Sequence, residues 1–382
     1  MPNDDGGYGA RVGPVWRAVL RDYRCGAGAR ARARLGFLTP PAARGRLIWI
    51  RAGESAADLR LGIELLGAVR DKRLDVRIVL TFEQDYPELF ERHMQPFRKV
   101  GVGYGPCDRP RVVRRVLRRF QPHGIIQAGG TVPRNLARMN TAPLFAVNAA
   151  PPGEGIPAGS LVGSWPVDVA AVAAWPSAAT AQVLPPADPQ ARFVEAQADV
   201  VLRALVGGQV ERLWWWHGTP AQWLEWRAAW KASAWGHSDI LLVSLGSETG
   251  GRGAMPEGCD LAVSAWDRGA LPPGTVLHLD DPRWFAAAAS AAHAVHLAVP
   301  ERAVLWQGLA GGAAVSLGVE SAFELPCPVY SQPGAVLDAW RTLRDDVAAR
   351  RRQGDAARRR FWEERRQVDA NFDAVLRQVW DW

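Results

Sequence analysis

The chain has 382 residues, of which 48% are hydrophobic and 22% charged, and this composition is that of a globular protein long enough for two domains. No apolar run approaches the roughly 20 residues of a transmembrane helix, and no signal peptide is visible, so we expect a cytoplasmic protein. The four cysteines are widely spaced and lack Cys-x-x-Cys spacing, which argues against a zinc site or a disulfide framework.

The net charge of +7 comes from arginine-rich stretches. They lie in the N-terminal segment, at Arg109–Arg119 and at Arg350–Arg366. Solvated helix faces would explain them, and so would an anionic partner. No nucleic-acid-binding motif accompanies the arginines, so nucleic acid is not the expected partner. An anionic membrane surface ranks first among anionic partners.

Residues 1–44 form an N-terminal segment with a glycine-rich start. Val15–Tyr23 is amphipathic, and an Arg/Ala-rich stretch continues to Phe37. Two interpretations are open: a helix at a membrane interface, or an ordinary first helix.

The next stretch organises the first domain, which we place at residues 45–185. Leu47–Ile50 is a short run rich in β-branched and aromatic residues, which predicts a buried strand. The run stops at Gly53, and a helical pattern begins near Ser55. A strand, a glycine turn and a helix place side chains and free N–H groups at the carboxyl edge of a parallel sheet. The carboxylate at this position is Glu54.

Strands and helices then alternate, which predicts a doubly wound parallel sheet. The expected helices are 56–72, 87–94 and 111–120, and the expected strands are 76–81, 99–104, 124–127 and 144–148. The apolar runs Val167–Ala174 and Ala181–Leu184 are candidates for the last edge strands.

After a proline-rich hinge the alternation resumes, and we place a second domain at residues 186–335. The expected helices are 191–205 and 220–235, and the expected strands are 212–216, 240–245, 261–265, 275–279, 294–298 and 313–317. Trp223, Trp226 and Trp230 have helical spacing, which favours core packing over a platform for sugars. Residues 336–382 form an arginine-rich helical tail.

The predicted fold is α/β, with two Rossmann-like doubly wound domains in a GT-B-like arrangement. Substrates of such folds bind in the cleft that the carboxyl edges of both sheets face. No cluster of carboxylates and histidines indicates a metal site, and the pattern does not reveal an oligomeric state.

Four stretches of the first half occur in the order found in the Kdo (3-deoxy-D-manno-octulosonic acid) transferases of lipopolysaccharide biosynthesis. They are Arg34–Phe37 with Leu47–Ile50, Gly53-Glu54, Val76–Thr81, and Asp108–Pro122; Val147–Ala149 is a weaker fifth match. Residues 30–150 therefore resemble that family. The resemblance implies an inverting glycosyltransferase that moves Kdo or a related sugar from a nucleotide-sugar such as CMP-Kdo to a lipid A-type acceptor, without a metal. It also implies a peripheral location at the inner face of a Gram-negative inner membrane.

The resemblance gives Glu54 the role of general base, which takes the proton of the acceptor hydroxyl. Residues beside it are expected to bind substrate: Arg51, Gly53, Ser55, Gly129, Gly130 and Asn135. Residues of the second half are expected to bind the donor: Gly218, Thr219, Gly246, Ser247, Arg252 and Gln307.

The second half follows the family in layout more than in residues. The family's acidic Glu-Thr-Glu-Leu-Trp-Pro-Asn loop is replaced by Gly129–Asn135, and its donor-site glutamate by Gln307. Two alternatives therefore stand beside the Kdo-transferase hypothesis. One is a catalytically inactive binding or scaffold protein, and the other is a glycosyltransferase with a different nucleotide-sugar donor.

Overall fold

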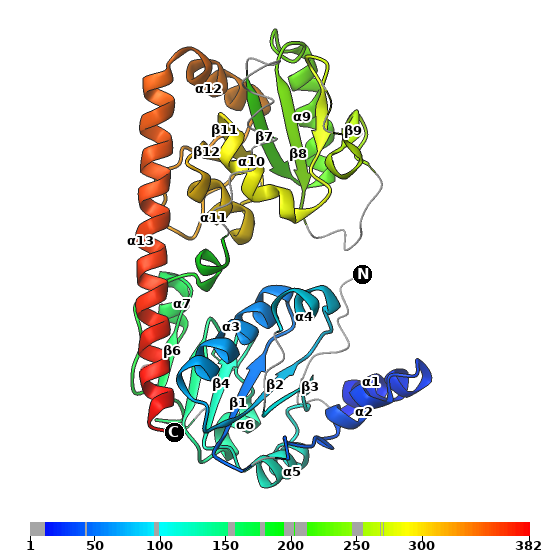
Figure 1. Ribbon diagram of the computed structural model, residues 1–382, viewed down its shortest axis with the longest axis vertical. Coiled ribbons are helices and arrows are strands. Elements are labelled where there is room, and N and C mark those ends of the chain that lie inside the picture. The colour runs from blue at the N-terminus through cyan, green and yellow to red at the C-terminus, as the bar shows by residue number, and fades with distance from the viewer. Residues whose placement is uncertain are drawn as a thin grey trace. The chain divides into compact units, whose positions relative to one another are not determined.

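The computed structural model describes the chain except residues 1–11, 43, 95–98, 152–156, 176–179, 195–201, 203–211, 247–254, 268 and 270. The described chain forms two compact units (Figure 1). Unit 1 is Met1–Pro189 with Gln367–Trp382, and unit 2 is Gln190–Arg366. Within the described residues, no helix is both long and apolar enough to cross a membrane.

Unit 1 is built on a parallel sheet whose strands run in the order β3-β2-β1-β4-β5-β6. The strands are β1 (Leu47–Ala52), β2 (Arg77–Phe82), β3 (Val100–Tyr104), β4 (Gly124–Ala128), β5 (Leu144–Val147) and β6 (Gly163–Trp165). β1 and β4 are buried throughout, which explains their continuous apolar sequence. The central position of β1 confirms the predicted organising strand.

Helices cover both faces of this sheet (Figure 1). The helices of unit 1 are α1 (Val12–Arg24), α2 (Gly28–Arg34), α3 (Ala56–Lys72), α4 (Pro87–His93), α5 (Pro110–Phe120), α6 (Arg134–Met139) and α7 (Val169–Ala174). The short 3-10 helix η1 (Pro189–Phe193) begins at the last residue before unit 2. Gly62 of α3 packs on the Ile50 and Ala52 side of β1. Phe120 of α5 packs edge-on against Trp49 on the other side, with ring centroids 5.2 Å apart. Trp49 thereby anchors the strand whose end carries Glu54.

The prediction of edge strands at Val167–Ala174 and Ala181–Leu184 is largely wrong. Val169–Ala174 is helix α7, because alanine favours helix and the Asp168 carboxylate caps the helix by accepting from Ala171 N at 2.7 Å. The edge strand is Gly163–Trp165 instead. Thr180 and Val183 make isolated bridges to its flank. The predicted helix at 191–205 lies mostly outside the described residues.

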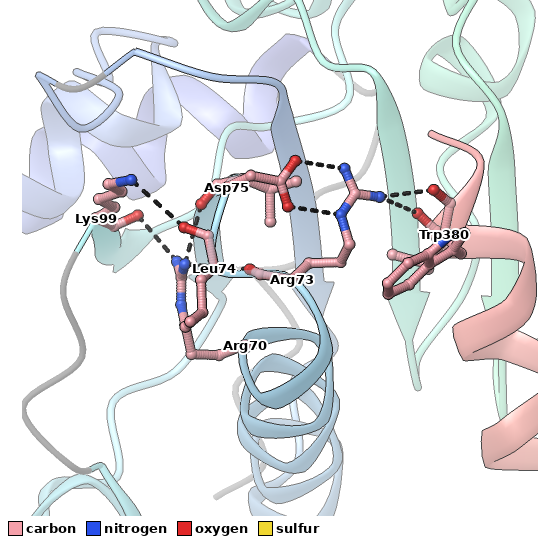
Figure 2. Close-up of polar contacts among 8 residues, drawn as sticks. Arg70, Arg73, Leu74, Asp75, Lys99 and Trp380 are labelled. Carbon is pink, nitrogen blue, oxygen red and sulfur yellow. Dashed lines mark hydrogen bonds and ion pairs between the residues drawn. The ribbon is translucent and has the colours of Figure 1, made fainter.

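The last residues of the chain complete unit 1. Trp382 packs directly on Gly124 at the start of β4, where a side chain would collide with the indole. Figure 2 shows the guanidinium of Arg73, which pairs with Asp75 and donates to the carbonyls of Val379 and Trp380 at 3.3 and 2.7 Å. The terminal carbonyls of a helix have few intrahelical donors, and Arg73 gives both of these a charged one; Val379 O also accepts from Trp382 N at 3.3 Å.

Unit 2 repeats the plan with a parallel sheet in the order β12-β11-β7-β8-β10-β9. Its strands are β7 (Leu213–Gly218), β8 (Ile240–Leu245), β9 (Leu261–Ala262), β10 (Val276–His278), β11 (Ala294–Leu297) and β12 (Ala314–Leu317). Its helices are α9 (Pro220–Ala232), η3 (Val263–Ala265), η4 (Pro282–Trp284), α10 (Phe285–Ala291), α11 (Arg302–Gly311) and α12 (Pro333–Asp345). Helix α13 (Val347–Trp380) begins in unit 2 and ends in unit 1.

One face of the second sheet is packed with tryptophans. We call Trp214, Trp216, Trp223, Trp226, Trp230, Trp235 and Trp340 the tryptophan cluster, and all seven are buried. Trp214 stacks on Trp340 with centroids 4.9 Å apart. Trp223, Trp226 and Trp230 belong to this cluster, which confirms that they are core residues.

Candidate active site

Glu54 lies immediately beyond the central strand of unit 1, at its carboxyl end. Gly53 extends the strand by donating to Ala128 O at 2.9 Å. Ser55 then begins α3 through a capping box: its hydroxyl accepts from Asp58 N at 3.1 Å, and the Asp58 carboxylate accepts from Ser55 N at 3.2 Å. Glu54 is therefore fixed between a strand end and a capped helix, and it is exposed to solvent.

The glycines around Glu54 are there because the backbone and Asp58 leave no room for side chains. A Cβ at Gly53 would collide with the Asp58 carboxylate and lie 2.7 Å from Gly130 N. Gly129 has φ of +70°, and a Cβ there would also collide with Asp58. Asp58 thus packs against both glycine turns, which lie next to each other beside Glu54. The structure brings together Gly53, Gly129 and Gly130, and their role in substrate binding stays a prediction.

A second carboxylate stands beside Glu54. Glu83 follows β2, the neighbour of β1, so it lies at the same carboxyl edge of the sheet as Glu54, which acts on its pKa through a hydrogen bond and through charge. Glu83 keeps a small part of its surface in solvent, but its carboxyl group is densely surrounded. Burial raises the pKa of Glu83 well above its usual value, and the bond and charge of Glu54 raise it further, whereas Arg51 and Arg34 lower it.

Sequence analysis missed Glu83, although a signal was present. Arg51 of β1 is paired with Thr81 of β2, so residues two or three positions beyond them share the carboxyl edge of the sheet. A carboxylate follows each of these two adjacent strands. The two acids after the strands are visible in the sequence, but only the pairing of β1 with β2 in the structure shows that they share one edge.

Arg51 lies under this carboxylate pair. It is only 4% exposed, and its guanidinium is 5.4 Å from the centre of the Trp49 ring. Its charge also lowers the pKa of Asp108, although burial dominates and the pKa of Asp108 is raised. Arg51 is therefore a buried counter-charge to the acidic edge.

Asn135 is engaged by the protein itself. Its side-chain amide donates to Asp108 O at 2.6 Å, and its backbone N–H donates to the Asp108 carboxylate at 2.9 Å. Leu136 N donates to the same carboxylate at 3.0 Å, so Asp108 caps helix α6. Asn135 thus links the start of α5 to the start of α6, and its assignment to substrate binding stays a prediction.

The carboxyl edge of the sheet in unit 2 brings together three of the predicted donor residues. Gly246 N donates to Gly218 O at 3.0 Å, so the ends of β8 and β7 are joined. Thr219 caps α9, and its N–H donates to Gln222 Oε1 at 3.0 Å. Gln307 lies in the second turn of α11 and is half-buried. Ser247 and Arg252 lie outside the described residues.

His217, the residue before Gly218, is buried beside these turns. It is 1% exposed, and its Nδ1 is 2.9 Å from Ser244 Oγ. Its Nε2 is 3.9 Å from Glu301 Oε1. Burial lowers the pKa of His217 to about 4, so the imidazole is neutral at pH 7. A neutral, buried imidazole supports the structure of this edge and brings no positive charge to it.

Across the part of the chain that the structure describes, no group of three or more His, Cys, Asp or Glu side chains is placed to hold a metal ion.

Comparison with known proteins gives one family match. Residues 29–150 match the model of the 3-deoxy-D-manno-octulosonic-acid transferase (Kdo transferase) family, the same region that carries Glu54. No curated protein sequence matches the chain.

Three similar solved structures show the fold. A UDP-glucosyltransferase from Polygonum tinctorium is 8% identical with a TM-score of 0.54, over 89% of this chain and 100% of that chain. The S. aureus MnaA–UDP co-structure is 8% identical with a TM-score of 0.53, over 81% and 91%. The calicheamicin glycosyltransferase CalG4 is 12% identical with a TM-score of 0.51, over 88% and 100%.

These likenesses span both units and confirm the two-domain, GT-B-like α/β fold. A cleft faced by both sheets stays a prediction. The family match supplies the functional class that a fold alone does not. Residues 29–150 are thus similar to the Kdo transferase family, and this match supports a glycosyltransferase.

Proposed function

We propose that the protein transfers Kdo or a related sugar from a nucleotide donor such as CMP-Kdo to a lipid A-type or other glycan acceptor, with inversion and with Glu54 as general base. The observation that carries the proposal is the position of Glu54. It is an exposed carboxylate fixed between the central strand and a capped helix, inside the domain that matches the family.

In the proposed step, the acceptor hydroxyl attacks the anomeric carbon from the side opposite the leaving nucleotide. The bond from that carbon to the phosphate oxygen breaks as the new C–O bond forms, and the hydroxyl proton passes to Glu54. The leaving phosphate keeps the bonding electrons and needs N–H or cationic partners. Gly218, Thr219 and Gly246 are the described candidates, with Gln307 for a hydroxyl of the donor. The proposal includes no metal.

The outer face of α1 supports a peripheral location at the inner face of the inner membrane. Trp16, Leu20 and Tyr23 recur at helical spacing, and each is about half exposed. Arginines 17, 21 and 24 are exposed between them. Aromatic and aliphatic groups flanked by arginines suit the headgroup region of an anionic bilayer. We therefore propose that α1 brings the protein to the membrane that holds its acceptor.

The direct test is transfer from CMP-Kdo to a lipid A precursor. Glu54→Gln keeps the size of the side chain but cannot accept a proton, so kcat should fall by about 10²- to 10⁴-fold. The matched control is Glu64→Gln on helix α3, where Glu64 pairs with Arg60 at 3.0 Å, and its kcat should stay at the wild-type value. Undiminished turnover in Glu54→Gln would remove Glu54 from the base role.

A second candidate is a binding protein without catalysis. It is favoured by the N–H groups of Thr219 and Gly246, which donate to acceptors of the protein rather than standing open for phosphate. A third is a different donor, since similar folds include a UDP complex and a UDP-glucosyltransferase. A thermal-shift panel of CMP, UDP and their sugars separates these candidates. A bound nucleotide at 100 times its Kd stabilises by about 2.7 kcal/mol, and a panel without any shift favours the non-catalytic candidate.

A further inference from the structure

Unit 2 contains a cavity beside the outer strand of its sheet, β12. The cavity has a volume of about 500 Å³ and lies between residues 314–316 of β12, residues 328–330, residues 339–343 of α12 and residues 349–356 of α13. All of these belong to unit 2, and Figure 1 shows α12 and the start of α13 on the β12 side of that unit. None of the described donor candidates lines this space. We call it the β12 cavity.

Small side chains leave the β12 cavity open. Ala314, Ala339, Ala349 and Ala356 line it, so the strand and both helices each present a methyl group where a larger side chain would fill the space. Protein interiors are normally packed with few voids larger than a water molecule. A space of this size therefore needs walls that are held apart.

Two contacts fix the position of α13 beside the cavity. The guanidinium of Arg350 donates to Leu343 O at 3.2 Å, which ties the start of α13 to the end of α12. Gly354 comes so close to Gly312 that a Cβ on it would collide with Gly312 O. The β12 cavity is therefore preformed, as ligand pockets usually are.

One polar group of the cavity wall lacks a partner. The side-chain oxygen Oε1 of Gln353 is buried, and it accepts no hydrogen bond from the described residues. Ser316 is satisfied by contrast, because His296 Nδ1 lies 3.1 Å from its hydroxyl. A buried carbonyl oxygen without a donor costs free energy. Gln353 is therefore the position at which an N–H or O–H group of a ligand gains most.

The cavity also has a cation and an aromatic wall. Among the described residues that line it, Arg352 is the charged one, and its side chain is 72% exposed. Its contact with Asp346 is long, at 3.9 Å, and solvent weakens such pairs. Trp340 lines the cavity, and Trp214 stacks on its ring. A rigid indole with a weakly paired guanidinium nearby suits a flat molecule that carries a negative charge.

We propose that the β12 cavity binds an aromatic anion: a small molecule with a flat apolar body, an N–H or O–H group for Gln353 Oε1 and one anionic group for Arg352. The volume of the cavity lies in the range of sites for drug-sized ligands. The inference does not depend on the proposed transfer reaction, because the described residues that form this site have no part in it.

The test uses the full chain and two fluorescent probes. Anilinonaphthalene sulfonate, in the isomer whose N–H and sulfonate lie at opposite ends, has all three features of the proposed ligand. Phenylnaphthylamine has the same body and N–H without the sulfonate. Both probes brighten in apolar surroundings, so a titration gives Kd. Both should bind saturably with one molecule per chain, and the sulfonate should bind more tightly.

Two variants test the place and the charge. Ala349→Phe fills part of the cavity and should weaken the binding of both probes by at least about tenfold. Ala348→Phe, at the exposed neighbouring residue, is the matched control and should bind both probes as the wild type does. Arg352→Gln should weaken the sulfonate by about two- to fivefold and leave the neutral probe unchanged, as expected for an exposed ion pair.

A third variant tests the unpaired oxygen. Gln353→Met keeps the length of the side chain but removes the acceptor, so both probes should bind about three- to tenfold more weakly. The midpoint of thermal unfolding of the protein without probe should not fall, because an unsatisfied buried oxygen is lost. A purely structural role of Gln353 would instead lower the midpoint and leave both Kd values unchanged.

Three results would overturn the inference. They are the absence of saturable binding by the sulfonate probe, equal affinity in Ala349→Phe and the wild type, and equal loss of affinity in Ala348→Phe and Ala349→Phe. Should Ala349→Phe fail to fold, Gln353→Met decides: weaker binding at an undiminished unfolding midpoint supports the site, and unchanged binding rejects it.

Discussion

The two units begin their central strands in the same way. In unit 1, His123 N donates to Leu47 O at 2.8 Å, and Leu47 N donates back to His123 Nδ1 at 3.3 Å. In unit 2, His293 and Leu213 repeat the exchange at 2.7 and 3.3 Å. Each histidine precedes the strand that flanks the central strand on one side, β4 or β11. The two units share this arrangement at the starts of their strands. The side chains near the carboxyl ends of the strands differ in chemistry.

Unit 1 has densely surrounded acids at the carboxyl edge of its sheet, whereas unit 2 has buried histidines in its strands. Burial raises the pKa of Glu83 and of Asp108 in the first unit. Burial lowers the pKa of His217 and of His296 to about 4 in the second. The same strand plan therefore carries acids with raised pKa values in unit 1, and in unit 2 it carries histidines that are neutral at pH 7, with Glu301 beside His217. The comparison teaches that the strand plan does not decide the charge of the edge, which depends on the residues that follow each strand.

The largest expected effect is a different response of the two units to acid. The folded-state pKa values of His217 and His296 lie below the usual 6.5, so their contribution is complete above pH 6.5 and is lost as pH falls towards about 4. Lowering the pH from 7 to 5 should cost unit 2 about 2 kcal/mol per histidine. Burial raises the pKa of Glu83 well above its usual value, so its contribution to the stability of unit 1 should not fall over the same range.

Hydrogen exchange read by mass spectrometry, corrected for the intrinsic effect of pH, measures each unit separately. Peptides of β7 and β11 should lose protection at pH 5 while those of β1 and β4 keep theirs. In a variant with His217→Gln and His296→Gln, the loss of protection at pH 5 should become smaller, and what remains is expected from His278 and His293, whose pKa values burial also lowers. Loss of protection in unit 1 before unit 2 would contradict the assigned directions.

The next effect concerns the core of unit 2, which the tryptophan cluster forms. Trp340 is 1% exposed, stacks on Trp214 and meets Trp226 edge-on with centroids 5.3 Å apart. Trp340→Ala should destabilise unit 2 by about 3–5 kcal/mol, because the rigid indoles around it cannot close the cavity. Denaturant unfolding with exchange readout should place the loss in unit 2 alone.

Trp340→Phe is the matched control. Trp340 Nε1 is buried and has no hydrogen-bond partner among the described residues. Phenylalanine removes that N–H while it keeps an aromatic ring in the cluster, so the cost should be clearly smaller. Equal losses in the two variants would mean that ring packing is not what stabilises this core.

Much of the fold follows from local pattern. Buried parallel strands have continuous apolar sequences, so β1 and β8 were predicted within two residues. Capping residues fixed the starts of α3 at Ser55 and of α9 at Thr219. The edge of the first sheet was predicted less well, because an edge strand as short as Gly163–Trp165 carries little periodic signal and Val169–Ala174 is apolar in either conformation.

The candidate site was only half predictable. Glu54 follows from a strand, a glycine and a helix start that are adjacent in the sequence. Glu83 depends on the pairing of β1 with β2, and Asn135 on its bonds to Asp108, 27 residues away. Such partners require the tertiary structure, since periodicity identifies elements but not which strand ends come together.

The smallest effect concerns the last residues of the chain, Gln367–Trp382, which belong to unit 1. Unit 2 is one continuous range, Gln190–Arg366. Arg73→Ala removes the donors to the carbonyls of Val379 and Trp380 that Figure 2 shows, and it leaves these helix-end acceptors without their charged partner. Hydrogen bonds to charged donors contribute about 1.5–3 kcal/mol, so peptides of residues 367–382 should exchange faster by about one to two orders of magnitude.

Asp75→Asn, at an exposed carboxylate, should cost much less because solvent screens the pair. Arg73→Lys should fall between the two, since an ammonium keeps the charge but cannot bond both carbonyls and Asp75 with the fixed geometry of a guanidinium. Because Gln367–Trp382 belongs to unit 1, the faster exchange should reach β4, where Trp382 packs on Gly124, and should spare β7. Faster exchange in β7 as well would show that the end of the chain stabilises both units, and the comparison between them would then have to treat α13 as shared.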